Sequence, residues 1–248
     1  MIGSLVVVGT GPGNPELMTP ATEAALARAT DLVGYGPYLA RVPVRGDQCR
    51  HASENRVELE RARLALSLAA SGRKVVVVSG GDPGVFAMAA AVFEAVEAGD
   101  PAWRDLDIRV EPGVTAMLAA AAEAGAPLGG DFCAISLSDN LKAWSTIERR
   151  LTLAAEADFV IALYNPASKA RPHQLGQAFE LLKKIKAATT PVLFVRAAGT
   201  PEAHVVTTTL GDADPSRADM RTLVIVGAST TRQVGRWVYT PRGEREAP

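Results

Sequence analysis

The stretch Ser79-Gly80-Gly81-Asp82-Pro83-Gly84-Val85-Phe86, which directly follows four valines at 75–78, decides the fold of this chain. It predicts a buried strand at 74–79 that runs into two glycines. The Asp-Pro pair then has the form of a helix N-cap followed by a first helical residue, so it predicts a helix at 84–98. Helix capping alone would explain this pair, without any ligand. Two glycines ahead of it let a ligand approach the main chain at the carboxyl end of a strand, where open α/β sheets bind their ligands.

Two more glycine loops follow predicted strands in the same half of the chain. Gly9-Thr10-Gly11-Pro12-Gly13 follows a strand at 4–9, and Glu111-Pro112-Gly113-Val114-Thr115-Ala116 follows a strand at 107–111. Three such loops indicate a shaped small-molecule cleft.

The first of these loops also invites comparison with a dinucleotide-binding fingerprint. Asn14 interrupts the glycine spacing, and Pro12 and Pro15 have no amide hydrogens with which to cradle a pyrophosphate. A tight turn at the floor of a cleft is the favoured interpretation. An NAD(P)-dependent reductase stays as a remote alternative.

Short β-branched runs alternate with longer alanine- and leucine-rich segments, which is typical of an α/β protein with a mainly parallel sheet. The break at 125–130 divides the chain into a domain at 1–124 and one at 125–248, the second with a mixed sheet. In the first half we expect strands at 4–9, 31–34, 74–79 and 107–111, and helices at 19–29, 55–71, 84–98 and 114–124. In the second half we expect strands at 131–137, 158–164, 191–196, 204–209 and 222–226, and helices at 141–156 and 172–187.

The composition limits the possible partners and compartments. The chain has 248 residues, 48% of them hydrophobic, and a net charge of −1, which argues against nucleic-acid and polybasic membrane partners. Its two cysteines, Cys49 and Cys133, lie far apart and predict neither a disulfide framework nor a cysteine-built metal site. The start of the chain has no form of a signal peptide, and no run is long enough to span a membrane. We expect a cytoplasmic protein without a metal.

Charged side chains gather in two segments. The predicted polar loop after the second strand carries Cys49-Arg50-His51, either a nucleophile with its base or, more simply, an exposed pair. Arginines in and around it could grip carboxylates through paired hydrogen bonds, or could only be solvated. The members of this cluster are Arg41, Arg45, Arg50 and Arg56, and a smaller cluster consists of Lys169, Arg171 and His173.

Together the loops resemble the tetrapyrrole methylase family of S-adenosylmethionine-dependent enzymes. The three glycine loops carry the resemblance with Leu163-Tyr164-Asn165-Pro166 and Arg196-Ala197-Ala198-Gly199-Thr200. The segments Gly34-Tyr35-Gly36-Pro37-Tyr38-Leu39 and Leu137-Ser138-Asp139-Asn140-Leu141 look most like members that methylate C17 of precorrin-3B and help contract the ring to precorrin-4 for cobalamin. Relatives that act on the cobalt-containing ring, or at another ring carbon, are the near alternatives.

The resemblance implies a homodimer of two α/β domains, with S-adenosylmethionine in the cleft between them and S-adenosylhomocysteine as its product. Asn165 stands where siroheme-type members have methionine, and Gly34-Tyr35-Gly36 where they bear an aspartate. The implied cofactor-binding residues are Pro12, Gly80, Gly81, Asp82, Val85, Thr115, Ala116, Tyr164, Asn165, Ala197 and Gly199.

The implied chemistry assigns roles to the charged residues. Methyl transfer depends mainly on positioning, whereas ring contraction requires a base of near-neutral pKa. By residue type His51 is the first candidate for this base, followed by Asp139 and Cys49. The carboxylates of the tetrapyrrole would be bound by Arg41, Arg45, Arg50, Arg56, Lys169 and Arg171. A non-enzymatic nucleotide sensor would bind the cofactor without any methyl acceptor.

Overall fold

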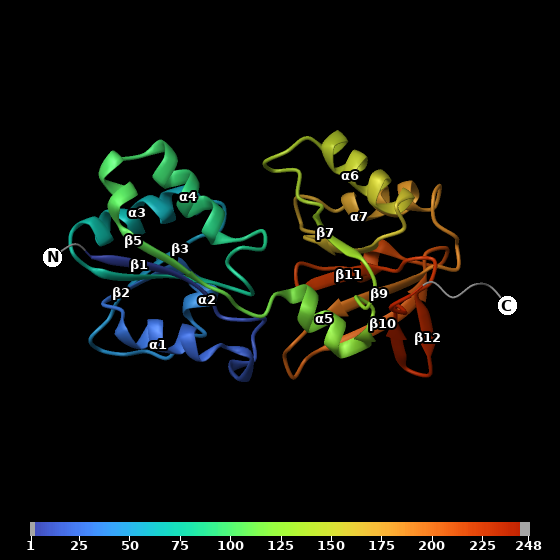
Figure 1. Cartoon of the computed structure of the whole chain (residues 1–248), viewed down its shortest axis with the longest axis horizontal. Helices are drawn as coiled ribbons and strands as arrows, with labels where there is room; N and C mark the ends of the chain where they lie inside the picture. The colour runs from blue at the N-terminus through green and yellow to red at the C-terminus, as the bar shows by residue number, and fades with distance from the viewer. Residues whose placement is uncertain (1–2, 244–248) are drawn as a thin grey trace. The chain divides into compact units, whose positions relative to one another are not determined.

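The computed structural model describes residues 3–243 and has the expected α/β architecture (Figure 1). The chain divides into two compact units, one ending at Ala116 and the other beginning at Met117. The expected boundary at 124/125 would place the helix Ala116–Ala124 with the first domain, so the two divisions differ by this helix.

The first unit is built on a five-stranded parallel sheet in the order β3-β2-β4-β1-β5. The expected strands at its centre are confirmed. Its elements are β1 (Ser4–Gly9), η1 (Pro15–Leu17), α1 (Pro20–Arg28), β2 (Asp31–Tyr35), α2 (Gly36–Leu39), β3 (Cys49–Ser53), α3 (Glu58–Ala70), β4 (Lys74–Ser79), α4 (Met88–Ala98), η2 (Pro101–Asp105) and β5 (Asp107–Glu111).

Helices cover both faces of this sheet (Figure 1). Val75 and Val77 of β4 pack in the core beneath α3 and α4, whereas Val76 and Val78 pack in the core with α1 and α2. Because both faces of β4 are buried, its sequence is a continuous run of valines and does not alternate with polar residues.

The sheet has a topological switch point between β1 and β4. The two strands are neighbours, but β1 leads into α1 on one face and β4 leads into α4 on the other. A crevice forms at the carboxyl ends of such strands, because the chain leaves them in opposite directions. The loops that follow β1 and β4 are the first two glycine loops.

Two local expectations in this unit are wrong. Helix α4 begins at Met88 and not at 84, because Asp82 is used to cross-link loops and does not cap the helix. Residues Cys49–Ser53 form the edge strand β3, where a polar loop was expected. An edge strand exposes much of its surface, so it does not require the apolar alternation by which strands are recognised.

The second unit contains a mixed five-stranded sheet in the order β10-β9-β11-β8-β7 and a small sheet in the order β12-β13-β6. The expected mixed sheet is confirmed, since β9 pairs antiparallel with β10 while β7 pairs parallel with β8, and α6 and α7 pack on one face of it. The elements are α5 (Ala116–Ala124), β6 (Gly125–Ala126), β7 (Phe132–Ser136), α6 (Trp144–Glu156), β8 (Val160–Tyr164), α7 (Gln174–Leu182), β9 (Pro191–Arg196), β10 (His204–Thr209), η3 (Pro215–Arg217), β11 (Thr222–Val226), β12 (Arg232–Val234) and β13 (Trp237–Tyr239). Within residues 3–243, no helix combines the length and apolar character that a membrane crossing requires.

Candidate functional site

The three glycine loops of the first unit are joined through their backbones at the carboxyl ends of β1, β4 and β5. The Gly11 and Gly81 amides each donate to the other residue's carbonyl, at 3.2 and 2.8 Å. Thr10 donates to the Ser79 carbonyl twice, from its amide at 2.9 Å and from its hydroxyl at 3.0 Å. These bonds fix the first two loops against each other at the switch point.

Two glycines are required by this packing alone. A Cβ on Gly9 would lie 2.5 Å from the Gly81 carbonyl oxygen, and a Cβ on Gly113 would lie 2.4 Å from the same atom. Both distances are far below van der Waals contact with backbone that cannot swing away. The space that a side chain would need at these two positions is therefore occupied by the backbone of the second loop.

The glycine pair of the second loop serves two purposes. A Cβ on Gly80 would lie 2.7 Å from the Tyr38 ring, so this glycine makes room for an aromatic side chain. Gly81 has φ +64°, and its nearest neighbours to an added Cβ are Thr115 Cα at 3.8 Å and Ala116 N at 3.9 Å. Only the second glycine leaves space beside its Cα for a ligand.

Asp82 cross-links the second loop to the third. Its Oδ1 accepts a hydrogen bond from the Gly84 amide at 2.8 Å, and its Oδ2 accepts one from the Gly113 amide at 3.0 Å. Beyond it, Val85 is half-buried and Phe86 takes φ 52°, which a non-glycine residue rarely adopts. Backbone strain of this kind gathers at ligand-binding turns.

The geometry disfavours the nicotinamide reading of the first loop. A dinucleotide loop offers free amides and leads directly into a helix. Here the Gly11 amide is bonded to Gly81, and α1 begins only at Pro20. Pro12, half-buried beside this pair, has no amide to add.

The amino end of the same sheet holds a cluster of charged side chains. Asp31 is 1% exposed and accepts hydrogen bonds from Arg73 Nε at 2.6 Å, from the Thr30 hydroxyl at 2.7 Å and, at 2.9 Å, pairs with His51 Nε2. Burial raises the pKa of Asp31, but the hydrogen bonds from Arg73, His51 and Thr30 outweigh it and hold the pKa at about 2. This carboxylate is ionised at every physiological pH.

His51 and Cys49 belong to this amino end. The β2–β3 register pairs Cys49 with Asp31, the first residue of β2, and the His51 ring reaches back to the Asp31 carboxylate. The glycine loops follow the opposite ends of their strands. Position therefore favours a structural role for His51 over the role of a base expected from its residue type.

The arginine cluster is largely engaged within the protein. The Arg50 guanidinium donates to the carbonyls of Leu39, Val42 and Pro43, and Arg45 pairs with Asp47. The other two members lie apart from these contacts: Arg41 stacks on the Tyr38 ring with its Cζ 5.4 Å from the centroid, and Arg56 occupies a turn with φ 69°.

In the second unit, Asn165 and Ala197 each follow the carboxyl end of a strand, and these two strand ends lie on the same side of the mixed sheet. β8 and β9 are both antiparallel to β11, so they run in the same direction. Asn165 has φ 51° and Ala197 has φ 52°, and both are non-glycine residues. Positive φ angles at non-glycine residues, found at Phe86 in the first unit, therefore also occur at two expected cofactor residues of the second unit.

Side chains at this edge connect the neighbouring segments. The Met117 amide donates to Tyr164 Oη at 3.0 Å, Asn165 Nδ2 donates to the Ser136 hydroxyl at 2.9 Å, and the Gly199 amide donates to Glu123 Oε1 at 3.3 Å.

Asp139 and Arg171 lie close to the same edge. Asp139 follows β7 and accepts from Gln174 Nε2 at 3.1 Å. Arg171 donates from Nη1 to the Asn165 carbonyl at 3.2 Å, while its buried Nε has no hydrogen-bond partner among residues 3–243. Lys169, within the same loop, is exposed.

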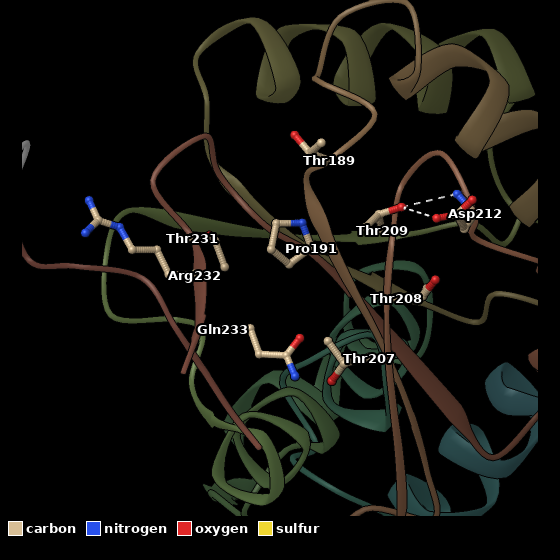
Figure 2. Close-up of a pocket in the computed structure, with 9 residues that line it drawn as sticks. All are labelled: Thr189, Pro191, Thr207, Thr208, Thr209, Asp212, Thr231, Arg232 and Gln233. Carbon is tan, nitrogen blue, oxygen red and sulfur yellow. Dashed lines mark hydrogen bonds between the residues drawn. The ribbon is translucent and has the colours of Figure 1, made fainter. Parts of the chain in front are cut away.

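A polar groove lies at the other end of β9. Figure 2 shows its threonine side chains, with Thr209 and Asp212 hydrogen-bonded to each other. Pro191 begins β9 in this groove, whereas Ala197 directly follows the last residue of that strand. None of the expected site residues lines it.

Sequence reasoning missed one residue at the carboxyl end of the first sheet, Arg61 of α3. Its side chain is almost completely buried, at 5% exposed. It shares its helical stripe with the buried Ala65 and Ala69, at the spacing of a helix face that packs on a core. That spacing is the signal that could have identified it.

Comparisons with known proteins agree with the geometry. The family model for tetrapyrrole (corrin/porphyrin) methylases matches residues 4–214. A precorrin-3B C(17)-methyltransferase from Sinorhizobium sp is 60% identical over 247 residues, which cover 98% of this chain and 97% of the relative. A Salmonella typhimurium protein named "Probable cobalt-factor III C(17)-methyltransferase" is 44% identical over 240 residues, 96% of this chain and 98% of that protein.

A solved structure of the methyltransferase CobJ has a TM-score of 0.94 and 56% sequence identity to this chain. The likeness covers 96% of this chain and 100% of that one. The chain belongs to the tetrapyrrole methylase family, whose members are S-adenosylmethionine-dependent methyltransferases.

Proposed function

We propose that this enzyme methylates C17 of precorrin-3B and contributes to contraction of the ring to precorrin-4, a step of cobalamin biosynthesis. The observation that carries the proposal is the 60% identity to a precorrin-3B C(17)-methyltransferase along almost the whole of both chains. The three interlocked glycine loops at the switch point support it, because they form a ligand-binding end of the kind such a cofactor requires.

The first-unit residues fit S-adenosylmethionine, which when bound supplies a methyl group on a positively charged sulfur. The space beside the Gly81 Cα can receive part of a ligand, and Thr115 and Ala116 are its nearest neighbours. Pro12, Asp82 and Val85 flank or brace this position. Loops that are bonded to one another hold a donor at a fixed distance and direction, and such positioning lowers the barrier to methyl transfer.

The assignments in the second unit rest on the family resemblance. Tyr164, Asn165, Ala197 and Gly199 are proposed to contact the cofactor, and the strained backbone at Asn165 and Ala197 supports a binding role for those turns. Arg171 and Arg50 each keep a buried Nε without a hydrogen-bond partner in the described part of the chain. Of the two, Arg171 is the better-supported carboxylate-binding residue, because it also donates to the carbonyl of Asn165, an expected cofactor residue.

Asp139 becomes the leading candidate for the base in ring contraction. Of the three candidates, it alone follows the carboxyl end of a strand, whereas Cys49 and His51 belong to the amino end of the first sheet. Gln174 already orients its carboxylate through Oδ2. Its role would be to accept a proton from a ring hydroxyl.

The decisive experiment supplies the enzyme with precorrin-3B and S-adenosylmethionine labelled in its methyl carbon. NMR of the product is expected to locate the label at C17 of a contracted ring. A label at another carbon would contradict the proposal. In parallel, calorimetry is expected to detect binding of S-adenosylhomocysteine and none of NADPH; the reverse result would favour a reductase.

The similarity to the Salmonella protein supports a second candidate substrate, cobalt-factor III. Incubation with each acceptor in turn separates the two, since the better substrate is the one with the higher kcat/KM. The homodimer implied by the resemblance is proposed alongside, and light scattering coupled to size-exclusion chromatography tests it.

A further inference from the structure

Arg61 is a buried cation whose hydrogen-bond partners are all neutral. Its guanidinium donates to the Ser53 hydroxyl at 2.8 Å, the Glu54 carbonyl at 2.6 Å and the Met88 sulfur at 3.2 Å. Within residues 3–243, no carboxylate oxygen lies within 4.0 Å of it. Burial lowers the pKa of Arg61, although an arginine remains charged in proteins.

This charge lies at the ligand-binding end of the sheet. Ser53 is the last residue of β3, Glu54 follows it, and Met88 is the first residue of α4, which continues from the second glycine loop. Glu58 of the same helix acts on the charge of Arg61, as do Tyr38 and Tyr35. Tyr35 ends β2, and Tyr38 lies in α2 with its ring against the Gly80 position. Arg61 therefore stands behind the second glycine loop.

The acceptors that Arg61 has are poor partners for a buried charge. A hydroxyl and a carbonyl are neutral, and a thioether is a weak acceptor. Burying a cation whose hydrogen-bond partners are all neutral is costly, and a carboxylate that replaced the weakest of these partners would offset that cost. Met88, with three rotatable bonds, is a side chain that can move aside and release Nη1.

Three arginines of the cluster around β3 are engaged by other groups of the protein. Arg50 is committed to three backbone carbonyls, Arg45 to Asp47, and Arg41 to the Tyr38 ring. Arg61 differs from these three in being almost completely buried, with a thioether as the acceptor at Nη1.

We propose that Arg61 binds a carboxylate of the tetrapyrrole acceptor, which takes the place of the Met88 sulfur at Nη1. The inference rests on the proposed function and names a specificity-determining residue for it. Recognition of this kind selects acceptors with an acidic side chain over neutral macrocycles of the same size, because a guanidinium pairs with a carboxylate in a fixed geometry.

The test compares three variants of the full chain, Arg61→Met, Arg61→Lys and Arg63→Met. Arg63 is exposed on the same helix, so Arg63→Met removes the same charge from the outer face and is the matched control. The probes are uroporphyrin III, a stable tetrapyrrole polycarboxylate, followed by fluorescence anisotropy, and S-adenosylhomocysteine, followed by calorimetry.

Arg61→Met is expected to raise the Kd for uroporphyrin III by about 10- to 100-fold, with the Kd for S-adenosylhomocysteine unchanged. Arg61→Lys is expected to fall between this variant and the wild type, because it keeps a point charge but loses the fork. Arg63→Met is expected to match the wild type for both probes.

Two results would overturn the inference. One is wild-type affinity for uroporphyrin III in Arg61→Met, or in Arg61→Lys if the methionine variant does not fold. The other is an equal loss of affinity for both probes, which would make Arg61 merely structural. If the wild type itself binds neither probe, the proposed function fails instead.

Discussion

The carboxyl end of the first sheet is built almost entirely from backbone, whereas its amino end is held by charged side chains. At the carboxyl end, Gly9, Gly81 and Gly113 pack main chain against main chain. At the amino end, Asp31 binds Arg73 and His51. By residue type the charged end looks catalytic, yet topology and loop strain favour the other end as the site. Positioning chemistry needs fixed loops more than it needs titratable groups.

The comparison is tested most severely by Gly113→Ala. The new Cβ would lie 2.4 Å from the Gly81 oxygen and 2.8 Å from the Gly9 oxygen, so the loops must separate. We expect a loss of about 3 kcal/mol or more in unfolding free energy and about 100-fold in turnover. Urea unfolding and methyl-transfer assays measure the two effects.

Gly36→Ala is the control for this variant, because nothing lies within 4 Å of its new Cβ. It should stay within about 1 kcal/mol of the wild type. A Gly113→Ala enzyme with normal stability and turnover would contradict the view that the loops act through backbone contact.

Asp31→Asn is expected to lower stability without affecting the ligand. The folded pKa of Asp31 is about 2 against an ordinary 3.8, so the carboxylate stabilises the fold by about 2 kcal/mol at pH 7. Because the folded pKa is depressed, this contribution is present above pH 4 and is lost as the pH falls toward 2. Unfolding of wild type and variant across pH 7 to 2.5 should converge at the acid end.

The amino-end comparison has its own control in Asp107→Asn. Asp107 begins β5 at the same end but is exposed, in a surface pair with Arg109, and its replacement should cost under about 1 kcal/mol. Weaker binding of S-adenosylhomocysteine to Asp31→Asn would show that the two ends are not independent.

Ala197→Gly extends the comparison to the second sheet. Glycine adopts φ 52° without the steric cost that alanine bears, so this variant should gain about 1 kcal/mol of stability. Ala198→Gly, at a buried neighbour without positive φ, should lose a similar amount. Thermal unfolding distinguishes the two variants. If both are less stable than the wild type, the positive φ of Ala197 is not strained.

His51→Gln has the smallest expected effect. The rate of ring contraction should remain within about twofold of wild type, since the imidazole hydrogen-bonds to Asp31 and a glutamine can replace that one hydrogen bond.

Asp139→Asn should instead slow contraction more than methylation. The measurement is the time course of precorrin-4 formation, and slow contraction in His51→Gln alone would restore His51 as the base.

The sequence predicted the parallel core because buried strands such as 75–78 are continuous valine runs bounded by glycines. It did not predict β3, because Cys-Arg-His-Ala-Ser lacks any apolar pattern. The small hairpin β12–β13 was also missed. Its strands have three residues each, too few for a periodicity to appear.

The candidate site was predictable in its loops and less so in its side chains. Glycines after a strand can be recognised in the sequence as positions where the backbone lacks a side chain. The role of Asp82, in contrast, depends on its hydrogen bond with Gly113, 31 residues away. Asp82 and Pro83 have the sequence signature of a helix start, but Asp82 binds the third glycine loop and the helix begins only at Met88. Arg61 was overlooked because an arginine in a helix is normally solvated, although its spacing with the buried Ala65 and Ala69 places it on the core face.

The two edges of the first sheet have a further consequence, for association between chains. The edge strand β3 carries Arg50, and the edge strand β5 carries Asp107, Arg109 and Glu111. Charged side chains on an edge strand oppose pairing with a strand from another molecule. This sheet is therefore protected from growing into aggregates at either side. A dimer of this enzyme is expected to use a surface other than an extended first sheet.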